Sequence, residues 1–525
     1  MKKLTALFLA ICLVFTACAC GGKEQPKPKD TSRPETETAS VPENEDENTE
    51  NEAPAEPEKI VYVYMTQNNM PETGELERIQ KLLNEYTIEK INTEVELVLF
   101  SNSDYSTQLN LRLAGNEQSD LYRSMLSGYS TIDYIKDGSA LDITDYLSTH
   151  LTDAVDVMYD GLLATSTVNG RVYGLNVVTS NYVPRGWCYR TDIIEELDID
   201  LSQVSSVFDL TDVFARVKEA YPDMVLCDPN RANVAFQAYL QDTLHMDPLG
   251  GDSSNAFSGV VMGDDATVVN LYEREEFKAI ASLMREWYQA GYFPSDAATS
   301  TATTAELASS GNLFSMFAGL GNPKIAATFT SNYGYSYDSI TISEAYSLST
   351  TYDVWMINAN CKAPEAAAKF LNLTFTDPYV YNLLTYGEEG TDYTLDENGC
   401  AVAPEGYDSL ADVPYTNNLN YPYFGNKWLA YPVPGGLTGD AFEENKQQNY
   451  SAKLSEFYGF VYDNSEVEAE YLACSNIAEE YKKAVWVGSL ELDQAIDDLN
   501  SKLYAAGLQK VLDSKQTQLD AWLGN

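Results

Sequence analysis

Residues 60–122 read IVYVYMTQNNMPETGELERIQKLLNEYTIEKINTEVELVLFSNSDYSTQLNLRLAGNEQSDLY, and this stretch decides the fold. Its apolar pattern switches between the periods of a strand and of a helix. The predicted elements are a strand at 60–64, a helix at 74–91, a strand at 93–100, a helix at 105–114 and a short strand at 119–122. Strands that alternate with helices are typical of a parallel sheet covered by helices, so we predict an α/β fold.

The same alternation continues along the rest of the 525 residues, a length that suffices for two or three domains. The pattern predicts helices at 209–221, 273–291 and 364–375 and strands at 224–227, 313–317 and 354–357. From about residue 466 the sequence becomes helical, with apolar residues three and four apart over 467–487 and 490–523. We therefore expect a helical C-terminal region.

The first twenty residues indicate export from the cell. Lys2 and Lys3 precede an apolar run at 4–15, which is too short to span a membrane and predicts a signal peptide. The small residues around Cys18 and Cys20 resemble the lipobox of bacterial lipoproteins. We therefore predict a lipoprotein signal at 1–20, with Cys20 (or Cys18) acylated and the protein anchored to the outer face of the cell membrane. The alternative is an ordinary secretory signal with two incidental cysteines.

Residues 21–58 are rich in Glu, Pro, Thr and Asn and contain almost no large apolar side chains. Such a segment cannot bury enough surface to offset the entropy of ordering. We predict a disordered acidic tether that holds the folded body away from the membrane.

The formal net charge is −46, and most of it lies in the folded body. A field of this sign disfavours nucleic acid and anionic lipid surfaces and weakly favours neutral or cationic ligands. Solubility outside the cell explains the charge equally well.

The composition indicates neither a metal site nor a cofactor. The only histidines, His150 and His245, lack ligand spacing, and the five cysteines of the body contain no CxxC pair. Phosphate-binding glycine motifs are absent as well. We expect no metal, no cofactor and buried free thiols.

Five segments resemble a known family. They are 105–121 (YSTQLNLRLAGNEQSDL), 169–176 (NGRVYGLN), 189–194 (YRTDII), 457–463 (FYGFVYD) and 509–523 (QKVLDSKQTQLDAWL). The first three are similar to segments of extracellular solute-binding protein family 1, the carbohydrate-binding lipoproteins of ABC transporters, although Asn176 stands where Pro is usual. The last two resemble the ending of the LipO-like subgroup.

The resemblance implies a two-lobe periplasmic-binding-protein-like (type II) fold with hinge crossovers. The lobes would comprise residues 59–175 plus 313–355 and residues 176–312 plus 356–525. It implies a protein that is no enzyme, that captures an oligosaccharide in an interlobe cleft outside the cell and that delivers it to a permease. We expect a monomer that binds no nucleic acid. Peptide and polyamine binders share this architecture, so the solute class stays open.

Four segments at the expected lobe edges combine aromatic and polar side chains, as sugar recognition requires. Tyr64 ends the first predicted strand and Asn68 and Asn69 follow it, at the end of a strand where α/β proteins bind ligands. The other candidates lie near the crossovers or in the Asn-rich segment 418–428, and they are Tyr182, Arg185, Trp187, Asp353, Trp355, Asn418, Tyr421, Tyr423 and Trp428. For each of them, packing alone is the alternative role.

The alternative function is a secreted glycoside hydrolase or another glycan-active enzyme. Glu388, Glu389 and Asp392 form a carboxylate cluster that could supply acid and base catalysis, although a solvated loop explains it better. Segment 392–399 resembles a calcium loop only weakly, and Asn398-Gly399 predicts a hairpin turn.

Overall fold

The computed structural model describes residues 56–66, 70–125, 130–159, 161–180, 182–250, 253–322, 324–349, 353–415 and 423–524. Residues 55–525 group into one compact unit. The predicted signal peptide, the cysteine predicted to be acylated and nearly all of the predicted tether lie outside the described residues, and the first strand begins at Glu58.

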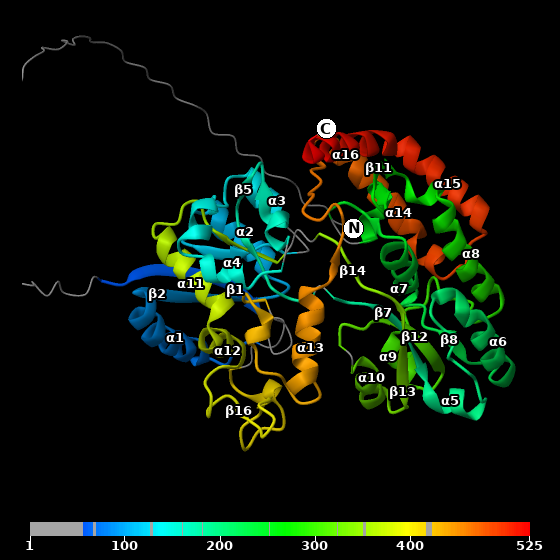
Figure 1. Ribbon diagram of the computed structural model, residues 1–525, viewed down its shortest axis with the longest axis horizontal. Helices are drawn as coiled ribbons and strands as arrows, with labels where there is room; N and C mark the ends of the chain where they lie inside the picture. The colour runs from blue at the N-terminus through cyan, green and yellow to red at the C-terminus, as the bar shows by residue number, and fades with distance from the viewer. Residues whose placement is uncertain are drawn as a thin grey trace, which may run out of the picture. The chain divides into compact units, whose positions relative to one another are not determined.

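The first sheet has five strands in the order β2-β1-β3-β15-β6. They are β1 (Glu58–Thr66), β2 (Thr93–Ser101), β3 (Leu121–Arg123), β6 (Leu175–Asn176) and β15 (Val354–Ile357). β1 pairs in parallel with β2 over its whole length and also with β3, whereas β15 is antiparallel to both of its neighbours. A strand from late in the sequence thus completes a sheet that the first strands begin (Figure 1).

Helices cover both faces of this sheet, and β1 is accordingly buried on both sides. Ile60, Tyr62 and Tyr64 belong to the core that contains α1 (Glu75–Ile91), α11 (Pro364–Thr376) and α12 (Pro378–Tyr386). Val61, Val63 and Met65 belong to the opposite core, with α2 (Tyr105–Ala114). Successive side chains of β1 point to opposite faces of the sheet, so alternate residues pack into the two different cores.

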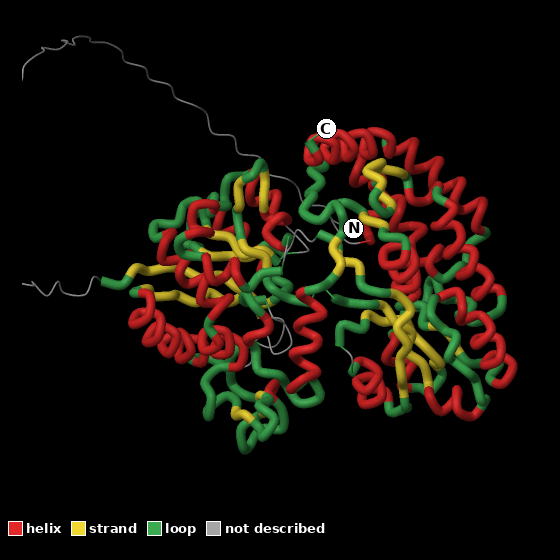
Figure 2. The backbone as a smooth tube through the Cα atoms, viewed as in Figure 1, coloured by secondary structure: helices red, strands yellow, loops and turns green. Residues whose placement is uncertain are grey.

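The second sheet has four strands in the order β13-β7-β12-β8. They are β7 (Arg185–Arg190), β8 (Val225–Cys227), β12 (Leu313–Gly319) and β13 (Tyr337–Ser343), and Figure 2 shows them as a separate group of strands. Trp187 of β7 is fully buried here, stacked on Tyr189 at 4.7 Å and in edge contact with Phe214 and Phe314. It lies in the centre of the second core.

Three helices form the C-terminal region: α14 (Glu468–Trp486), α15 (Leu492–Ala506) and α16 (Leu508–Leu523). α14 and α15 contribute to the second core, whereas α16 packs on α14 and α15. α14 and α15 lie beside α8 (Glu275–Gln289) in Figure 1. The sequence pattern over 490–523 is continuous, yet the structure divides it at Gly507, whose φ of 105° is left-handed and therefore ends a helix.

A buried lysine connects α16 to residues 248–259 by hydrogen bonds. Lys515 is 1% exposed, and its Nζ donates to the carbonyls of Pro248 (3.0 Å) and Gly259 (3.0 Å) and to the hydroxyl of Ser258 (2.7 Å). Burial lowers the pKa of Lys515 to about 7, although nearby Asp247 opposes the shift.

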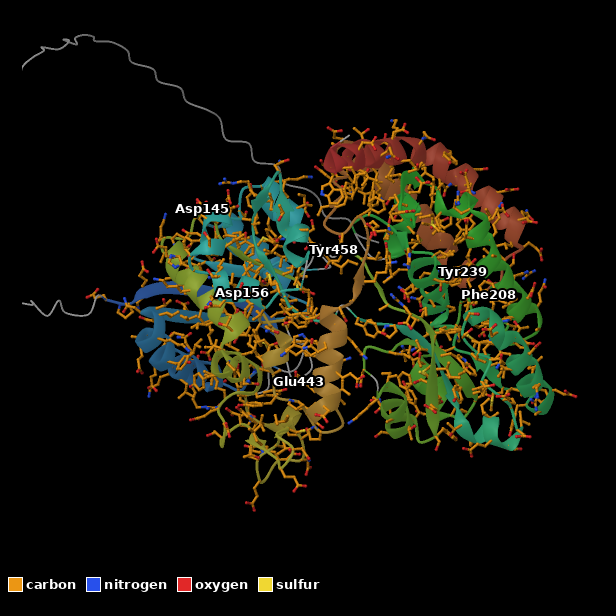
Figure 3. All side chains as sticks on the ribbon, viewed as in Figure 1. Asp145, Asp156, Phe208, Tyr239, Glu443 and Tyr458 are labelled. Carbon is orange, nitrogen blue, oxygen red and sulfur yellow. The ribbon has the colours of Figure 1, made fainter. Side chains whose placement is uncertain are left out.

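Shorter elements connect these parts. The helices are α3 (Thr131–Lys136), α4 (Thr152–Asp156), α5 (Thr191–Glu196), α6 (Thr211–Ala220), α7 (Ala232–Phe236), α9 (Thr304–Ser309), α10 (Ile325–Tyr333) and α13 (Gly439–Tyr450). The strands are β4 (Thr167–Val168), β5 (Arg171–Val172), β9 (Met246–Asp247), β10 (Val260–Met262), β11 (Asp265–Val269), β14 (Tyr346–Ser347), β16 (Thr394–Leu395), β17 (Ala401–Val402) and β18 (Lys453–Leu454). A π-helical turn at Gln237–Thr243 follows α7, and Tyr239 from it meets Phe208 edge to face (Figure 3).

The predicted elements are confirmed, but their grouping into two halves is partly wrong. Residues 313–355 were expected beside the first sheet, yet β12 and β13 pair with β7 in the second. Residues 356–525 were expected in the second half, yet α11 and α12 pack on the first sheet. Both errors have one cause. The spacing of apolar residues predicts whether a segment is a strand or a helix, but not which sheet the segment joins or packs on.

Two further expectations concern cysteines and membrane spans. The five described cysteines are free, and four of them are buried, with Cys361 partly exposed. Within the described ranges, no helix is both long enough and apolar enough to span a bilayer.

Replacing Trp187 tests the second core. Trp187→Ala should lower the free energy of unfolding by about 3–5 kcal/mol, because it leaves a cavity among aromatic rings. Urea unfolding followed by circular dichroism measures the change. The control Trp522→Ala removes an indole that is 45% exposed and should lower it by no more than about 1 kcal/mol. If Trp187→Ala and Trp522→Ala both lowered the free energy of unfolding by the same small amount, the burial of Trp187 would be contradicted.

The Lys515 ammonium predicts a pH dependence of stability. In the unfolded chain the Lys515 side chain has the ordinary lysine pKa of about 10.4. In the folded protein its pKa is about 7, so the ammonium loses its proton above that pH. Above pH 7 the unfolded state therefore binds more protons, and the free energy of unfolding should rise by roughly 1 kcal/mol per pH unit up to about pH 9. Lys515→Met should lack this slope in parallel urea titrations. Identical slopes in both proteins would refute the assignment.

Candidate functional site

The carboxyl ends of β1 and β3 meet the start of β15 at one edge of the first sheet. Here Nη1 of Arg123 lies 3.3 Å from Oδ1 of Asp353, and its guanidinium lies 4.2 Å from the centre of the Tyr423 ring. Burial raises the pKa of Asp353, although Arg123 opposes the shift. Asp353 has a φ of 62°, a left-handed backbone that few non-glycine residues adopt. At this edge of the first sheet, the ion pair between Arg123 and Asp353 therefore lies against the ring of Tyr423.

Two predicted binding residues lie beneath this edge and not at its surface. Tyr64 and Trp355 are both 2% exposed, and Trp355 stacks on Tyr62 at 4.6 Å and donates its Nε1–H to the carbonyl of Tyr423 (2.7 Å). They line a cavity of about 10 Å³, space for about one water. Their prediction as direct ligand contacts is wrong because both rings are used in packing, and Trp355 instead supports Tyr423.

A much larger pocket, of about 460 Å³, lies beside Tyr423. Its lining combines six aromatic side chains with hydroxyl, amide and ammonium groups. The residues are Thr179, Ser180, Gly321, Asn322, Tyr381, Thr385, Tyr386, Tyr423, Lys427, Trp428, Ala430, Tyr431, Pro432, Val433, Gly436, Leu437, Phe442 and Asn445. Gly321 and Asn322 lie in the segment that follows β12 of the second sheet, so this segment contributes to the lining.

Backbone pairing places the segment after Tyr423 against the crossover that follows β6. Val178 donates its N–H to the carbonyl of Gly425 (2.7 Å) and accepts from the N–H of Lys427 (3.0 Å). A Cβ on Gly425 would lie 2.4 Å from the carbonyl oxygen of Thr374, so this approach requires glycine. The pairing brings Lys427 to Ser180, and Nζ of Lys427 donates to the Ser180 hydroxyl.

Trp428 lies in the wall of the pocket, 9% exposed. Its Nε1–H donates to the hydroxyl of Tyr159 (2.7 Å), its ring meets Phe442 edge to face, and Nζ of Lys427 lies 4.2 Å from its centre. Phe442 comes from α13, which Glu443 marks in Figure 3. Trp428 therefore has both a packing role and a lining role.

The edge of the second sheet carries another polar network. Nη1 of Arg185 donates to Oδ1 of Asp242 (2.5 Å), and the Ser343 hydroxyl donates to Oδ2 of the same carboxylate (2.6 Å). Burial raises the pKa of Asp242 to about 6, although Arg185 opposes the shift. Tyr182 donates its hydroxyl to Glu344 (3.1 Å). Arg185 and Tyr182 are thus engaged with protein carboxylates at this edge.

The structure brings together only part of the predicted set. Tyr423 and Trp428 line the large pocket, whereas the prediction of Trp187 as a ligand contact is wrong because its side chain is fully buried. Asn68, Asn69, Asn418 and Tyr421 lie outside the described residues.

Sequence reasoning missed Lys427, Tyr386 and Tyr431. Lys427 lies within the segment singled out for its aromatic and Asn-rich composition, which was the available signal. Tyr386 lies on α12 among apolar residues and resembles a core position in sequence.

The carboxylate cluster does not resemble a catalytic pair. Arg78 pairs with Asp392 (2.7 Å) and with Glu388 (3.0 Å), which joins α1 to the segment after α12. Asn398-Gly399 lies in the turn between the antiparallel strands β16 and β17, as predicted. Among the residues that the structure covers, no group of His, Cys, Asp or Glu could hold a metal ion.

Comparison with known proteins gives relatives over most of the chain. A carbohydrate ABC transporter substrate-binding protein of Streptococcus pneumoniae is 25% identical over 456 residues, which cover 83% of this chain and 86% of the relative.

Two solved structures share the fold. The N-glycan transport solute-binding protein NgtS of S. pneumoniae has a TM-score of 0.70 at 22% identity and covers 89% of this chain and 99% of its own. A solute-binding protein of Bifidobacterium longum infantis, described as binding HMO, has a TM-score of 0.60 at 15% identity, with coverage of 89% and 99%. Both likenesses establish a two-lobe periplasmic-binding-protein-like fold.

Two family models match the chain. A domain of unknown function (DUF3502) matches residues 456–524, the segment that contains α14, α15 and α16. The model described as bacterial extracellular solute-binding protein matches residues 81–388, more than half of the chain. The chain therefore belongs to the bacterial extracellular solute-binding protein family.

Proposed function

We propose that this chain is the substrate-binding component of a carbohydrate ABC transporter, which captures an oligosaccharide and delivers it to a permease. The observation that carries the proposal is the pocket of about 460 Å³, lined by aromatic rings and polar groups. As a member of a solute-binding family, the chain is a binding protein and not an enzyme.

The pocket has the chemistry that a sugar needs. A sugar ring presents apolar C–H faces, which pack on aromatic rings, and a rim of hydroxyls, which need donors and acceptors. Tyr431 and Trp428 supply rings, whereas Ser180, Asn322 and Asn445 supply polar groups. The volume lies within the range of about 300–1,000 Å³ that small-molecule sites occupy.

The relatives support a sugar over a peptide or a polyamine. The S. pneumoniae relative is named as a carbohydrate transporter component. NgtS has been solved in complex with Man1GlcNAc and with Man5GlcNAc, and another structural neighbour, FusA, in complex with kestose.

We assign the two lobes from the sheets. The first lobe comprises β1 to β6 together with β15 to α13, and the second comprises β7 to β14 together with β18 to α16. The chain then crosses between the lobes three times, after β6, after β14 and after α13. Hinge closure at these crossovers would enclose a solute, to the extent that the solute binds the closed state more tightly.

The sequence supports a location outside the cell. Acylation of Cys20 (or Cys18) would anchor a monomer to the outer face of the membrane, with residues 21–58 as its tether and 1–20 as the signal peptide. The permease and the anchoring membrane are then its partners.

A thermal-shift screen tests sugar binding. Oligosaccharides that bind should raise the melting temperature as RT ln(1 + [L]/Kd), whereas peptides and polyamines should not. Tyr431→Ala should then weaken sugar binding about tenfold, because one stacking ring is lost from the lining. Tyr407→Ala, at a tyrosine 39% exposed and outside that lining, is the matched control. Stabilisation by peptides alone would reject a sugar, and breakdown of a bound sugar would reject a pure binder.

Fractionation of cells tests the anchor. Cys20→Ser should move the protein from the membrane fraction to the medium, because no acyl chain then holds it. Cys18→Ser distinguishes the two candidate cysteines. Membrane association that survives both substitutions together would reject lipid anchoring.

A further inference from the structure

The charge of the large pocket is opposite to that of the chain. The protein has 79 acidic and 33 basic residues, yet the described residues of the pocket lining include no Asp or Glu. Among these described lining residues, Lys427 is the one charged side chain. The site therefore combines aromatic walls with a single fixed cation.

The ammonium of Lys427 is incompletely satisfied by the protein. It carries three donors, and the described residues supply it with the hydroxyl of Ser180 and with the ring of Trp428. Across the ranges that the structure covers, no carboxylate lies within 4.0 Å of Lys427. Lys515, by comparison, has three acceptors around its buried ammonium. Lys427 thus has donors and a charge left for a ligand.

A second cation lies at the rim. Nζ of Lys324 donates to the carbonyl of Gly436 (2.8 Å), and Gly436 is part of the pocket lining. Lys324 likewise has no carboxylate within 4.0 Å in the described part of the chain. Two lysines therefore lie at this pocket with no carboxylate of the described residues close enough to pair with them.

We infer that the solute is an acidic oligosaccharide whose carboxylate, from a uronic or sialic acid residue, pairs with Lys427. This inference rests on the proposed function and narrows its substrate class. A neutral sugar would fill the open hydrogen bonds of Lys427 but leave its charge uncompensated in a desolvated site, whereas a carboxylate satisfies both.

The net charge of −46 does not oppose this pairing. Salt screens charges beyond about 8 Å at physiological ionic strength, so most of the acidic surface acts weakly on a bound anion. Within the pocket the lower dielectric strengthens the contact between carboxylate and ammonium. Burial lowers the pKa of Lys427 to about 8, so the side chain is mostly charged at pH 7, and a paired carboxylate would hold it charged.

Matched acids and esters test the inference. Calorimetric titration of the purified protein at pH 7 and 0.15 M salt compares trigalacturonate with its methyl ester and 3′-sialyllactose with its methyl ester. Each ester keeps the shape of its sugar and removes the charge. We expect the acid to bind at least tenfold more tightly than the ester in one pair or more. This comparison needs no variant.

Variants then locate the effect. Lys427→Met should abolish the preference for the acid, Lys427→Arg should retain much of it, and Lys362→Met, at an exposed lysine outside the lining, should leave it unchanged. Melting temperatures confirm that each variant is folded, and Lys427→Gln replaces Lys427→Met if the latter is not.

Esters or neutral trisaccharides that bind as tightly as every acid would overturn the inference while leaving sugar binding intact. A preference for the acid that survives in a folded Lys427 variant would overturn the role of Lys427. Failure of every sugar to bind, acidic or neutral, would overturn the proposed function itself and this inference with it.

Discussion

The insertion of β15 between β3 and β6 is the constraint on which the rest of the structure depends. β15 pairs with β3 on one side and with β6, the outermost strand, on the other, so it supplies hydrogen-bonding partners to both. Because β15 follows the whole second sheet in sequence, the first sheet is complete only when the chain has returned. The same strand carries Trp355, which supports Tyr423, and follows directly after Asp353, which pairs with Arg123.

Local structure was largely predictable from the sequence, because it depends on residues near one another in the chain. The period of β1 and the amphipathic pattern of α1 gave both elements within two residues of their bounds. The assignment of β12 to the wrong sheet shows the limit, since pairing between distant strands depends on which backbones meet. Gly507 shows a second limit, because one left-handed residue interrupts an otherwise continuous helical pattern.

The site was only partly predictable for a related reason. Aromatic residues near a crossover can point into a core or into a pocket, and composition does not distinguish the two. Trp187 points into a core, whereas Trp428 reaches the pocket wall because Val178 pairs with Gly425 and Lys427. Lys427 stands out because the described residues around it in the lining include no carboxylate, and the sequence alone does not show which residues surround it.

The position of the C-terminal helices has a consequence for biosynthesis. Val485 and Ile496, from α14 and α15, belong to the same core as Trp187, and Lys515 of α16 fills a cradle of carbonyls from residues 248–259. That core is therefore complete only after α14 and α15 have been synthesised. Until then, the apolar side chains that α14 and α15 cover remain exposed on the growing polypeptide, and exposed apolar surface of this kind promotes aggregation.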